Sequence, residues 1–404
     1  MKKLLRMTVI AALSVVLLFS LQGMSAVEHT TPDPLDIHDD EFYTTLTESI
    51  KTYNDIQDGL NSEVYSTSSG NSRDYNDYYG GAYIDEETGE LIVLVTELTP
   101  TVTNEISTYA KRGGNIRYQL CDVSYAEITE AIDTVTDHLA ELYDCGVDIT
   151  SVRDDILNGC VVIGVVDLDQ EKEAAIRAVA DYAFLVFEDS EGVNAEATYT
   201  FGSQIDTIRE DALPGTYIGS STLGFAARMD GQEGFVVAGH AGWVYGQTFK
   251  SGDTVLGHLT KTAAYSSFTT ADASFVEKEN GVSIANAKGG ARIVSASTDQ
   301  LPVNTPIYMF GFKTKGTSGK VCGTNSTFSP IRLDGKKMFV ENCTYGDYHS
   351  LRGDSGGPVV LIGAQGGNTY YRLAGIHTGS GNGYAYFSPY SNIVNELGVS
   401  YIPG

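Results

Sequence analysis

A serine in a glycine-rich turn is the residue of this chain best suited to act as a nucleophile. Residues 353–358 read Gly-Asp-Ser-Gly-Gly-Pro. Glycine lets a turn adopt positive φ and approach a substrate closely. The amides of Gly353 and Ser355 can then point at one spot, as the stabilisation of a developing oxyanion requires. The apolar run 359–362 predicts a buried strand that holds the turn rigid. The simpler alternative is a surface turn with an incidental serine.

A serine nucleophile needs a base, and the base needs an orienting acid. Among the seven histidines, His240 stands out because it ends the apolar run 234–239 and small residues follow it. Asp272 opens the apolar segment 272–276, where an unpaired carboxylate would be costly to bury. Taken singly, His240 also fits a satisfied core histidine, and Asp272 fits a strand-start cap. The order His, Asp, Ser along the chain makes coincidence a poor explanation, and it differs from the order in α/β-hydrolases and subtilisins.

The C-terminal half, from about residue 205 to 404, resembles chymotrypsin-fold serine proteases of the bacterial streptogrisin and α-lytic protease branch. The matching pieces occur in that family's order: 234–240, 272–276, 319–323, Cys343, 353–358, 375–379 and 386–389. The resemblance implies two six-stranded antiparallel β-barrels with the active site between them. It also implies that His240 is the general base, Asp272 its orienting acid and Ser355 the nucleophile. The oxyanion donors would be the amides of Gly353 and Ser355.

The composition of this half agrees with an all-β catalytic domain. Short apolar runs alternate with turn residues, which is typical of hairpins; the turn segments are 250–253, 279–281, 333–336 and 366–368. A helical pattern is expected only at 390–397.

Two features depart from the family pattern. Relatives often carry a cysteine directly after the catalytic histidine, where this chain has Ala241. The resemblance still implies a disulfide between Cys322 and Cys343. Relatives also pair the aspartate of the nucleophile turn with an internal cation, and we expect Lys315 to hold Asp354.

The N-terminus predicts export. A basic start, an apolar run from Thr8 to Leu21 and the small residues Ser25 and Ala26 are typical of a secretory signal peptide over residues 1–26. The alternative is an uncleaved anchor, for which the apolar run is short. Export makes disulfides plausible and predicts an extracellular bacterial protein without stable membrane association.

A change in charge divides the rest of the chain. Residues 27–204 hold 37 Asp and Glu against 8 Lys and Arg, whereas residues 205–404 hold 15 of each. Such an asymmetry indicates a domain boundary. It argues against nucleic-acid binding, because the acidic half would repel phosphates.

The acidic half has the patterns of a folded α+β domain. Ser124 and Glu127 form a capping box, and Ile128, Ile132, Val135, Leu139 and Leu142 share one helical face that ends near Gly146. We further expect a hairpin over 80–96, strands at 161–166 and 183–187, and a helix over 171–182.

This layout resembles the pro-regions of the same protease branch. The resemblance implies an intramolecular folding assistant and inhibitor, which suits an all-β topology that folds slowly. Autolysis is expected between Ala197 and Leu213. The alternative is a permanent regulatory or adhesive domain. Three cysteines of this half, Cys121, Cys145 and Cys160, leave at least one thiol unpaired unless one crosses to the other half.

The strand after the nucleophile lines the side-chain pocket in this fold. A histidine at His377 resembles glutamate-specific bacterial members, with Thr378 and Ser380 as nearby hydroxyls and Arg352 as a rim charge. We therefore expect cleavage after Glu, or after Asp. The alternative is a structural His377 and a preference for apolar side chains.

The sequence thus predicts a secreted serine endopeptidase, made as a zymogen and monomeric after maturation, acting on proteins or peptides. No metal or organic cofactor is expected, since no metal-ligand spacing occurs. The alternative from another class is a non-catalytic binding protein on a protease fold. A lipase or esterase is disfavoured by the residue order and by the all-β composition.

Overall fold

An α+β region precedes an all-β region along the chain, which confirms the expected fold class. The computed structural model describes residues 40–64, 76–110, 116–190, 194–195, 211–212, 217–218, 221–251, 254–264, 268–288, 291–330, 337–365 and 368–403. The predicted signal peptide, most of the predicted autolysis segment and the turn at 333–336 lie outside these residues.

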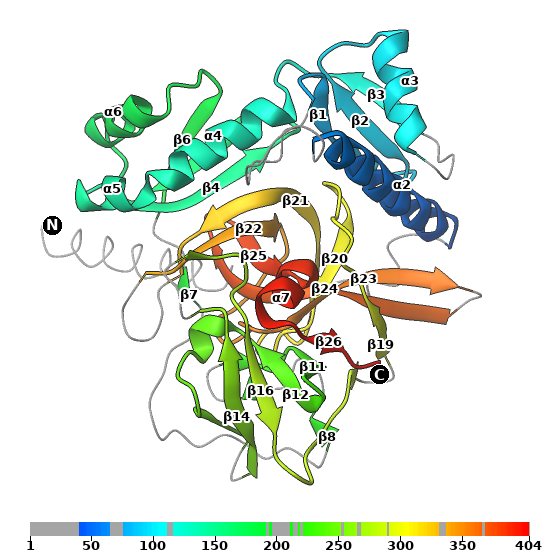
Figure 1. Ribbon diagram of the computed structural model, residues 1–404, viewed down its shortest axis with the longest axis vertical. Coiled ribbons are helices and arrows are strands. Elements are labelled where there is room, and N and C mark those ends of the chain that lie inside the picture. Colours follow the sequence, from blue (N-terminus) through cyan, green and yellow to red (C-terminus); the bar gives the residue numbers. More distant parts are fainter. Residues whose placement is uncertain are drawn as a thin grey trace, which may run out of the picture. The chain divides into compact units, whose positions relative to one another are not determined.

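The first part of the acidic half packs two helices against a three-stranded sheet (Figure 1). The elements are α2 (Asp40–Val64), β1 (Tyr79–Ile84), β2 (Leu91–Val95), α3 (Pro100–Tyr109) and β3 (Ile116–Leu120). β1 and β2 form the predicted antiparallel hairpin, and β3 pairs parallel to β2. Sequence analysis missed α2 and α3.

The second part contains a three-stranded sheet and three helices, namely α4 (Tyr125–Asp137), α5 (Leu139–Asp144), β4 (Ile149–Asp155), β5 (Cys160–Val165), α6 (Gln170–Val179) and β6 (Leu185–Asp189). The predicted capping box starts α4: Ser124 Oγ accepts from the Glu127 amide at 3.2 Å, and the Ser124 amide donates to Glu127 at 2.9 Å. The sequence predicted one helix from Ser124 to Gly146, whereas the structure has two, because a turn at His138 separates α4 from α5.

The first sheet of the all-β half has six strands in the order β13-β14-β16-β12-β11-β26. Their bounds are β11 (Phe225–Met229), β12 (Gln232–Val237), β13 (Thr248–Ser251), β14 (Thr254–Thr262), β16 (Ser274–Lys278) and β26 (Ser400–Tyr401). β13 and β14 pair antiparallel with Ser251 opposite Thr254, and part of the predicted turn at 250–253 lies outside the described residues. β26 comes from the end of the chain, so the C-terminus completes a sheet whose other strands lie far earlier.

The second sheet closes into a six-stranded barrel. Its strands are β20 (Pro306–Met309), β21 (Thr317–Phe328), β22 (Phe339–Gly346), β23 (Pro358–Gln365), β24 (Asn368–Gly381) and β25 (Tyr384–Pro389). β21 pairs with both β20 and β22, which closes the ring β20-β21-β22-β25-β24-β23. The predicted helix α7 (Tyr390–Leu397) follows directly.

Short elements connect and flank the two sheets. They are β7 (Asn194–Ala195), β8 (Asp211–Ala212), β9 (Tyr217–Ile218), β10 (Ser221–Thr222), the 3₁₀ turn η2 (Gly239–Ala241), β15 (Phe268–Thr269), β17 (Ser283–Ile284), β18 (Ala287–Lys288) and β19 (Ala291–Ala296).

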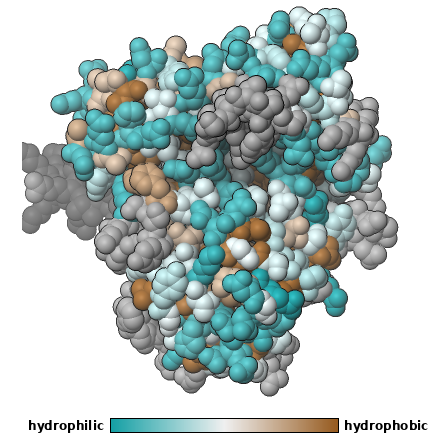
Figure 2. Space-filling model, viewed as in Figure 1, coloured by the Kyte–Doolittle hydropathy of each residue, from teal (hydrophilic) through white to brown (hydrophobic). Residues whose placement is uncertain are grey.

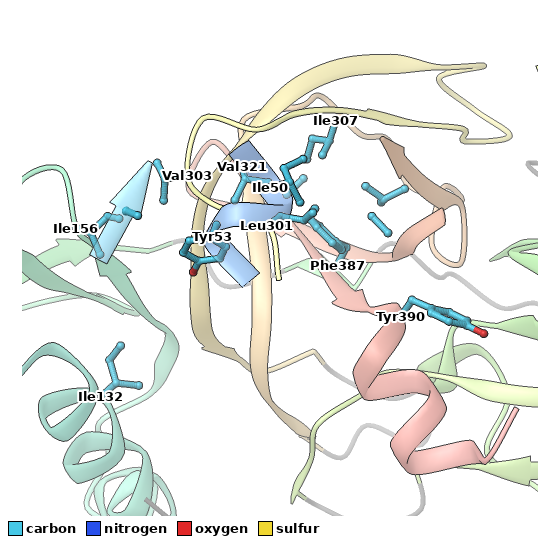
Figure 3. Close-up of a cluster of buried hydrophobic side chains, with 14 of the residues drawn as sticks. Ile50, Tyr53, Ile132, Ile156, Leu301, Val303, Ile307, Val321, Phe387 and Tyr390 are labelled. Carbon is cyan, nitrogen blue, oxygen red and sulfur yellow. The ribbon is translucent and has the colours of Figure 1, made fainter. Parts of the chain in front are cut away.

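The acidic half continues the barrel sheet. β4 pairs antiparallel with β21, setting Arg153 opposite Ser326, so β4, β5 and β6 extend the sheet beyond the ring. The apolar core is shared as well: Ile50 and Tyr53 of α2 lie with Leu301 and Ile307 in one buried cluster (Figure 3). Residues 38–404 accordingly form one compact unit.

The predicted disulfide is wrong. All five cysteines of the chain are free thiols, including Cys322 and Cys343. Cys343 lies opposite Ser326, whereas Gly323, the neighbour of Cys322, lies opposite Tyr345. This register separates the two cysteines along the ladder by more than the roughly 7 Å between Cα atoms that a disulfide tolerates.

Hydrophilic side chains cover most of the face seen in Figure 2, with apolar residues in small patches. Among the described residues, no helix combines the length and apolar character that a membrane span needs.

Candidate active site

The Ser355 turn has the positive φ values that its glycines predicted. Gly353 and Gly356 adopt φ values of 106° and 88°, which side-chain-bearing residues rarely adopt. Two groups of β10 hold the turn: the Thr222 amide donates to the Ser355 carbonyl at 2.7 Å, and Thr222 Oγ1 donates to the Gly353 carbonyl at 2.7 Å. Neither the Gly353 amide nor the Ser355 amide donates to any described residue.

Backbone amides, and not Lys315, hold the Asp354 carboxylate. It accepts from the amides of Lys313 at 2.7 Å, Thr314 at 3.2 Å and Leu351 at 2.8 Å, and the side chain is fully buried. The expected partner is wrong, because the Lys315 ammonium lies 4.4 Å from the centre of the Phe312 ring instead. Three N–H donors replace an ion pair in compensating the buried charge.

The structure brings His240 and Asp272 together. His240 lies in η2, and its Nδ1 is 2.6 Å from one oxygen of Asp272, while its amide donates to the other oxygen at 2.6 Å. A Cβ at Gly239 would lie 2.8 Å from the Ala273 amide, so only glycine allows this close approach. The Asp272 amide donates to Ser388 Oγ at 2.9 Å. Strands from both sheets thus position the pair.

Ser355 is not hydrogen-bonded to His240 in this full-length chain. Ser355 Oγ donates to the Thr378 carbonyl at 3.1 Å, and His240 Nε2 is buried without a partner among the described residues. His240, Asp272 and Ser355 are each 0% exposed. All three side chains are therefore shielded from solvent.

The predicted pocket residues divide into buried and exposed groups. His377 and Thr378 are fully buried, Ser380 is half-buried and Arg352 is exposed. The His377 amide donates to the Gly357 carbonyl at 2.8 Å, and the Gly356 amide donates to the His377 carbonyl at 2.7 Å. Both backbone groups of His377 on β24 are therefore bonded to the Ser355 turn.

A segment of the acidic half lies on this same strand. β7 pairs antiparallel with β24, with Ala195 opposite Gly379 and Asn194 opposite Ser380. The backbone of β24 next to Thr378 is thus already paired.

Sequence analysis missed several residues of the site. Tyr348 Oη lies 2.9 Å from His377 Nδ1, and Ser274 Oγ donates to the Gly242 carbonyl at 2.5 Å behind the histidine turn. Ser388 and Thr222 were missed too, although Ser388 falls in a matched segment and so carried a signal. Burial raises the pKa of the Cys343 thiol well above its usual range, and the nearby charge of Asp272 adds to that rise. Among the described residues, no His, Cys, Asp and Glu gather as metal ligands would.

Comparisons with known proteins match the two halves separately. Residues 39–113 match the family model of a Pro-like N-terminal domain. No curated protein matches the chain.

Solved structures match the all-β half. A chymotrypsin from Cellulomonas bogoriensis is 23% identical, with 48% of this chain and 100% of that one covered at a TM-score of 0.37. A Nocardiopsis protease is 25% identical, with 47% and 98% covered and a TM-score of 0.38. A glutamic acid-specific serine protease described as using a histidine triad in substrate binding is 26% identical, with 47% and 100% covered and a TM-score of 0.37. In this chain a Pro-like N-terminal domain thus precedes the all-β half, as the resemblance predicted.

Proposed function

We propose that the chain is a secreted serine endopeptidase made as an inactive precursor. The observation that carries the proposal is the buried contact of 2.6 Å between His240 and Asp272, together with a serine turn whose two amides donate to no described residue. His240 and Asp272 come from segments far apart in sequence, and an incidental serine turn would not require their contact. The proposed domains are a signal peptide at residues 1–26, an acidic pro-region at 27–204 and a protease domain at 205–404.

The proposed mechanism uses only residues of this chain. His240 Nε2 takes the proton from Ser355 Oγ as the serine attacks the scissile carbonyl, and Asp272 stabilises the imidazolium through Nδ1. The amides of Gly353 and Ser355 donate to the tetrahedral oxyanion. His240 then gives its proton to the leaving amine, and a water molecule repeats the sequence on the acyl-enzyme.

The covered site supports a latent precursor. With Ser355 and His240 both 0% exposed and Ser355 bonded to Thr378, a substrate cannot reach the nucleophile in the full-length chain. β7 already pairs with the strand that would bind a substrate backbone. Removal of the acidic half would expose the site, and autolysis between Ala197 and Leu213 would sever it. The strand pairing of β4 with β21 supports a second role for this half, as a template for the folding of the barrel.

For specificity we propose a preference for Glu, or for Asp, before the cleaved bond. A buried histidine on β24 with Thr378 beside it offers donors to a carboxylate: Thr378 Oγ1 is buried and has no partner among the described residues. Arg352, exposed at the start of the turn, adds a positive charge.

One observation favours a second candidate, a non-catalytic binding protein. The hydrogen bond between Ser355 and His240 is not made. Catalytic hydrogen bonds are often long or absent before substrate binds, so this alone does not decide between the two functions.

A fluorophosphonate probe, which labels only an activated serine, distinguishes the enzyme from the non-catalytic binding protein. We would express wild type and Ser355→Ala with their own leader, record the intact mass of the secreted protein, and treat each with the probe. An enzyme gives a shortened, labelled wild-type chain, while the Ser355→Ala chain stays long and unlabelled. An unlabelled wild-type chain after removal of the acidic half by an added protease would refute the enzyme.

A further inference from the structure

The side chain of Tyr348 contacts the imidazole of His377. Its hydroxyl lies 2.9 Å from Nδ1, and the two rings meet edge to face with their centroids 5.5 Å apart at 70°. The Tyr348 side chain is 2% exposed and that of His377 is 0% exposed. A hydrogen bond this well shielded from water is strong and directional.

The backbone on either side fixes both partners. His377 is bonded through its amide and carbonyl to Gly357 and Gly356. Next to Tyr348, the Lys320 amide donates to Asp347 Oδ1 at 2.7 Å, and the Asp347 amide donates to the Lys320 carbonyl at 3.2 Å. These contacts hold the backbone of both residues in place.

The tautomer of His377 decides how the two groups share a hydrogen, because a phenol can donate to a bare Nδ1 or accept from an Nδ1–H group. When the phenol donates to a neutral imidazole, the ring hydrogen lies on Nε2, and in an imidazolium both nitrogens carry one. In both of these states Nε2 is a donor. Without the phenol, a neutral ring could place its hydrogen on Nδ1 and turn a bare lone pair on Nε2 toward a carboxylate.

We propose that Tyr348 is a positioning residue for acidic substrates, holding His377 in the form whose Nε2–H donates to the substrate carboxylate. The inference rests on the proposed preference for Glu. Specificity would then depend on Tyr348, in the segment after β22, as well as on the residues of β24.

The test compares Tyr348→Phe with wild type on matched peptides that carry Glu, Gln or Leu before the cleaved bond. We expect kcat/KM for the Glu peptide to fall about tenfold, the worth of one buried hydrogen bond to a charged group, mainly through KM. The value for the Leu peptide should stay unchanged. The ratio of kcat/KM for the Glu peptide to that for the Leu peptide does not depend on the amount of active enzyme. A poor yield of the variant therefore does not affect the result. Tyr390→Phe, which removes a hydroxyl that accepts from the Tyr401 amide, is the matched control and should keep the ratio.

The outcomes separate this inference from the specificity on which it rests. A wild type that cuts after Leu as well as after Glu overturns both. A wild type that prefers Glu, with a Tyr348→Phe variant that keeps the same ratio, overturns only the role of Tyr348.

A second measurement applies even if Tyr348→Phe does not mature. In the full-length Ser355→Ala chain labelled with ¹⁵N-histidine, His377 should show a bare Nδ1 or the imidazolium, assigned through His377→Gln. A neutral ring with its hydrogen on Nδ1 would overturn the proposal. Adding Tyr348→Phe should shift the His377 signals, and unchanged signals would count against it.

Discussion

Asp272 and Asp354 are two buried carboxylates with different tasks at the residue scale. Asp354 satisfies three amides of the surrounding loops and so fixes the serine turn from behind. Asp272 instead accepts from both the amide and Nδ1 of His240, which fixes the ring tautomer that a general base needs. Both carboxylates act only as acceptors, so an amide at either position would present a donor to a donor.

Asp272→Asn should therefore abolish most activity while leaving the fold intact. We expect kcat to fall by about 10³- to 10⁴-fold, because the amide would favour the wrong tautomer of His240. The rate of fluorophosphonate labelling, measured on chains from which the acidic half has been removed, reports the loss. Asp230→Asn changes an exposed aspartate in the β11–β12 turn and should label at the wild-type rate. A decrease of less than tenfold in Asp272→Asn would contradict the proposed role.

The sequence could predict the residues of the site, but not which partners they take. The triad candidates and the oxyanion amides follow from local motifs, and of these residues His240 and Asp272 are in contact. The contact of Tyr348 with His377 joins two chain segments through the barrel, and no local pattern encodes it. Lys315 was expected to hold Asp354 because a cation is the usual partner of a buried carboxylate, yet three loop amides suffice.

At the scale of elements, local signals located α4 and α7. α4 begins at its capping box, and α7 ends at Gly398, which adopts φ 68°. α2 was missed although Phe42, Leu46, Ile50 and Tyr53 repeat at helical spacing and are all buried. The pairing of β4 with β21 was beyond reach, because a register between strands some 170 residues apart depends on the finished barrel and not on either strand.

The cap of α4 allows a test at this scale. Ser124→Ala removes the acceptor for the Glu127 amide and should lower the free energy of unfolding by about 1 kcal/mol. Urea unfolding of the full-length Ser355→Ala chain, with and without Ser124→Ala, measures the difference. Glu130→Ala, at an exposed position of the same helix, should change it by less than about 0.5 kcal/mol. Equal losses in the two variants would mean that the cap contributes nothing specific.

At the scale of the whole molecule, the acidic half contacts the barrel in two ways: β4 extends the barrel sheet, and α2 shares its apolar core. A third contact is the pairing of β7 with β24, the strand proposed to line the pocket. β7 ends at Ala195 on the pocket strand, and the next residue in the sequence is Glu196. A pocket for Glu would thus find its first substrate within its own chain.

We expect maturation to begin with a cut after Glu196, directly before the 197–213 segment in which the sequence predicts autolysis, and any later trimming to follow Asp206, Glu210 or Asp211. Intact mass and N-terminal sequencing of samples taken during secretion identify each product. Glu196→Gln should delay the first product but not change the activity of the enzyme once formed. A first product that begins after a neutral residue would argue against the acidic preference.

The sheet that joins the two halves contains an ionisable group at its centre. Asp154 of β4 is 1% exposed, and its carboxylate has only long contacts of 3.4 Å, to Tyr125 Oη and to the amides of Thr324 and Asn325 on β21. The neighbouring Arg153 does not neutralise it, since that guanidinium forms two bonds of 2.8 Å to Glu188 and lies 4.7 Å from the Tyr384 ring centre. Burial accordingly raises the pKa of Asp154 to about 7.

The stability of the full-length chain should therefore fall as pH rises through this range. With the pKa raised on folding, Asp154 adds stability that is complete below its unfolded pKa of 3.8 and is lost by the time pH passes about 7. The loss amounts to at most about 4 kcal/mol. Urea unfolding of the Ser355→Ala chain from acid to mildly alkaline pH measures it, and Asp154→Asn should remove this part of the slope. Asp181→Asn, at an exposed aspartate of the same half, should leave the slope intact. If Asp154→Asn keeps the wild-type slope, the carboxyl does not govern the contact; if it flattens the slope, ionisation of one buried group loosens the hold of the acidic half on the barrel near neutral pH.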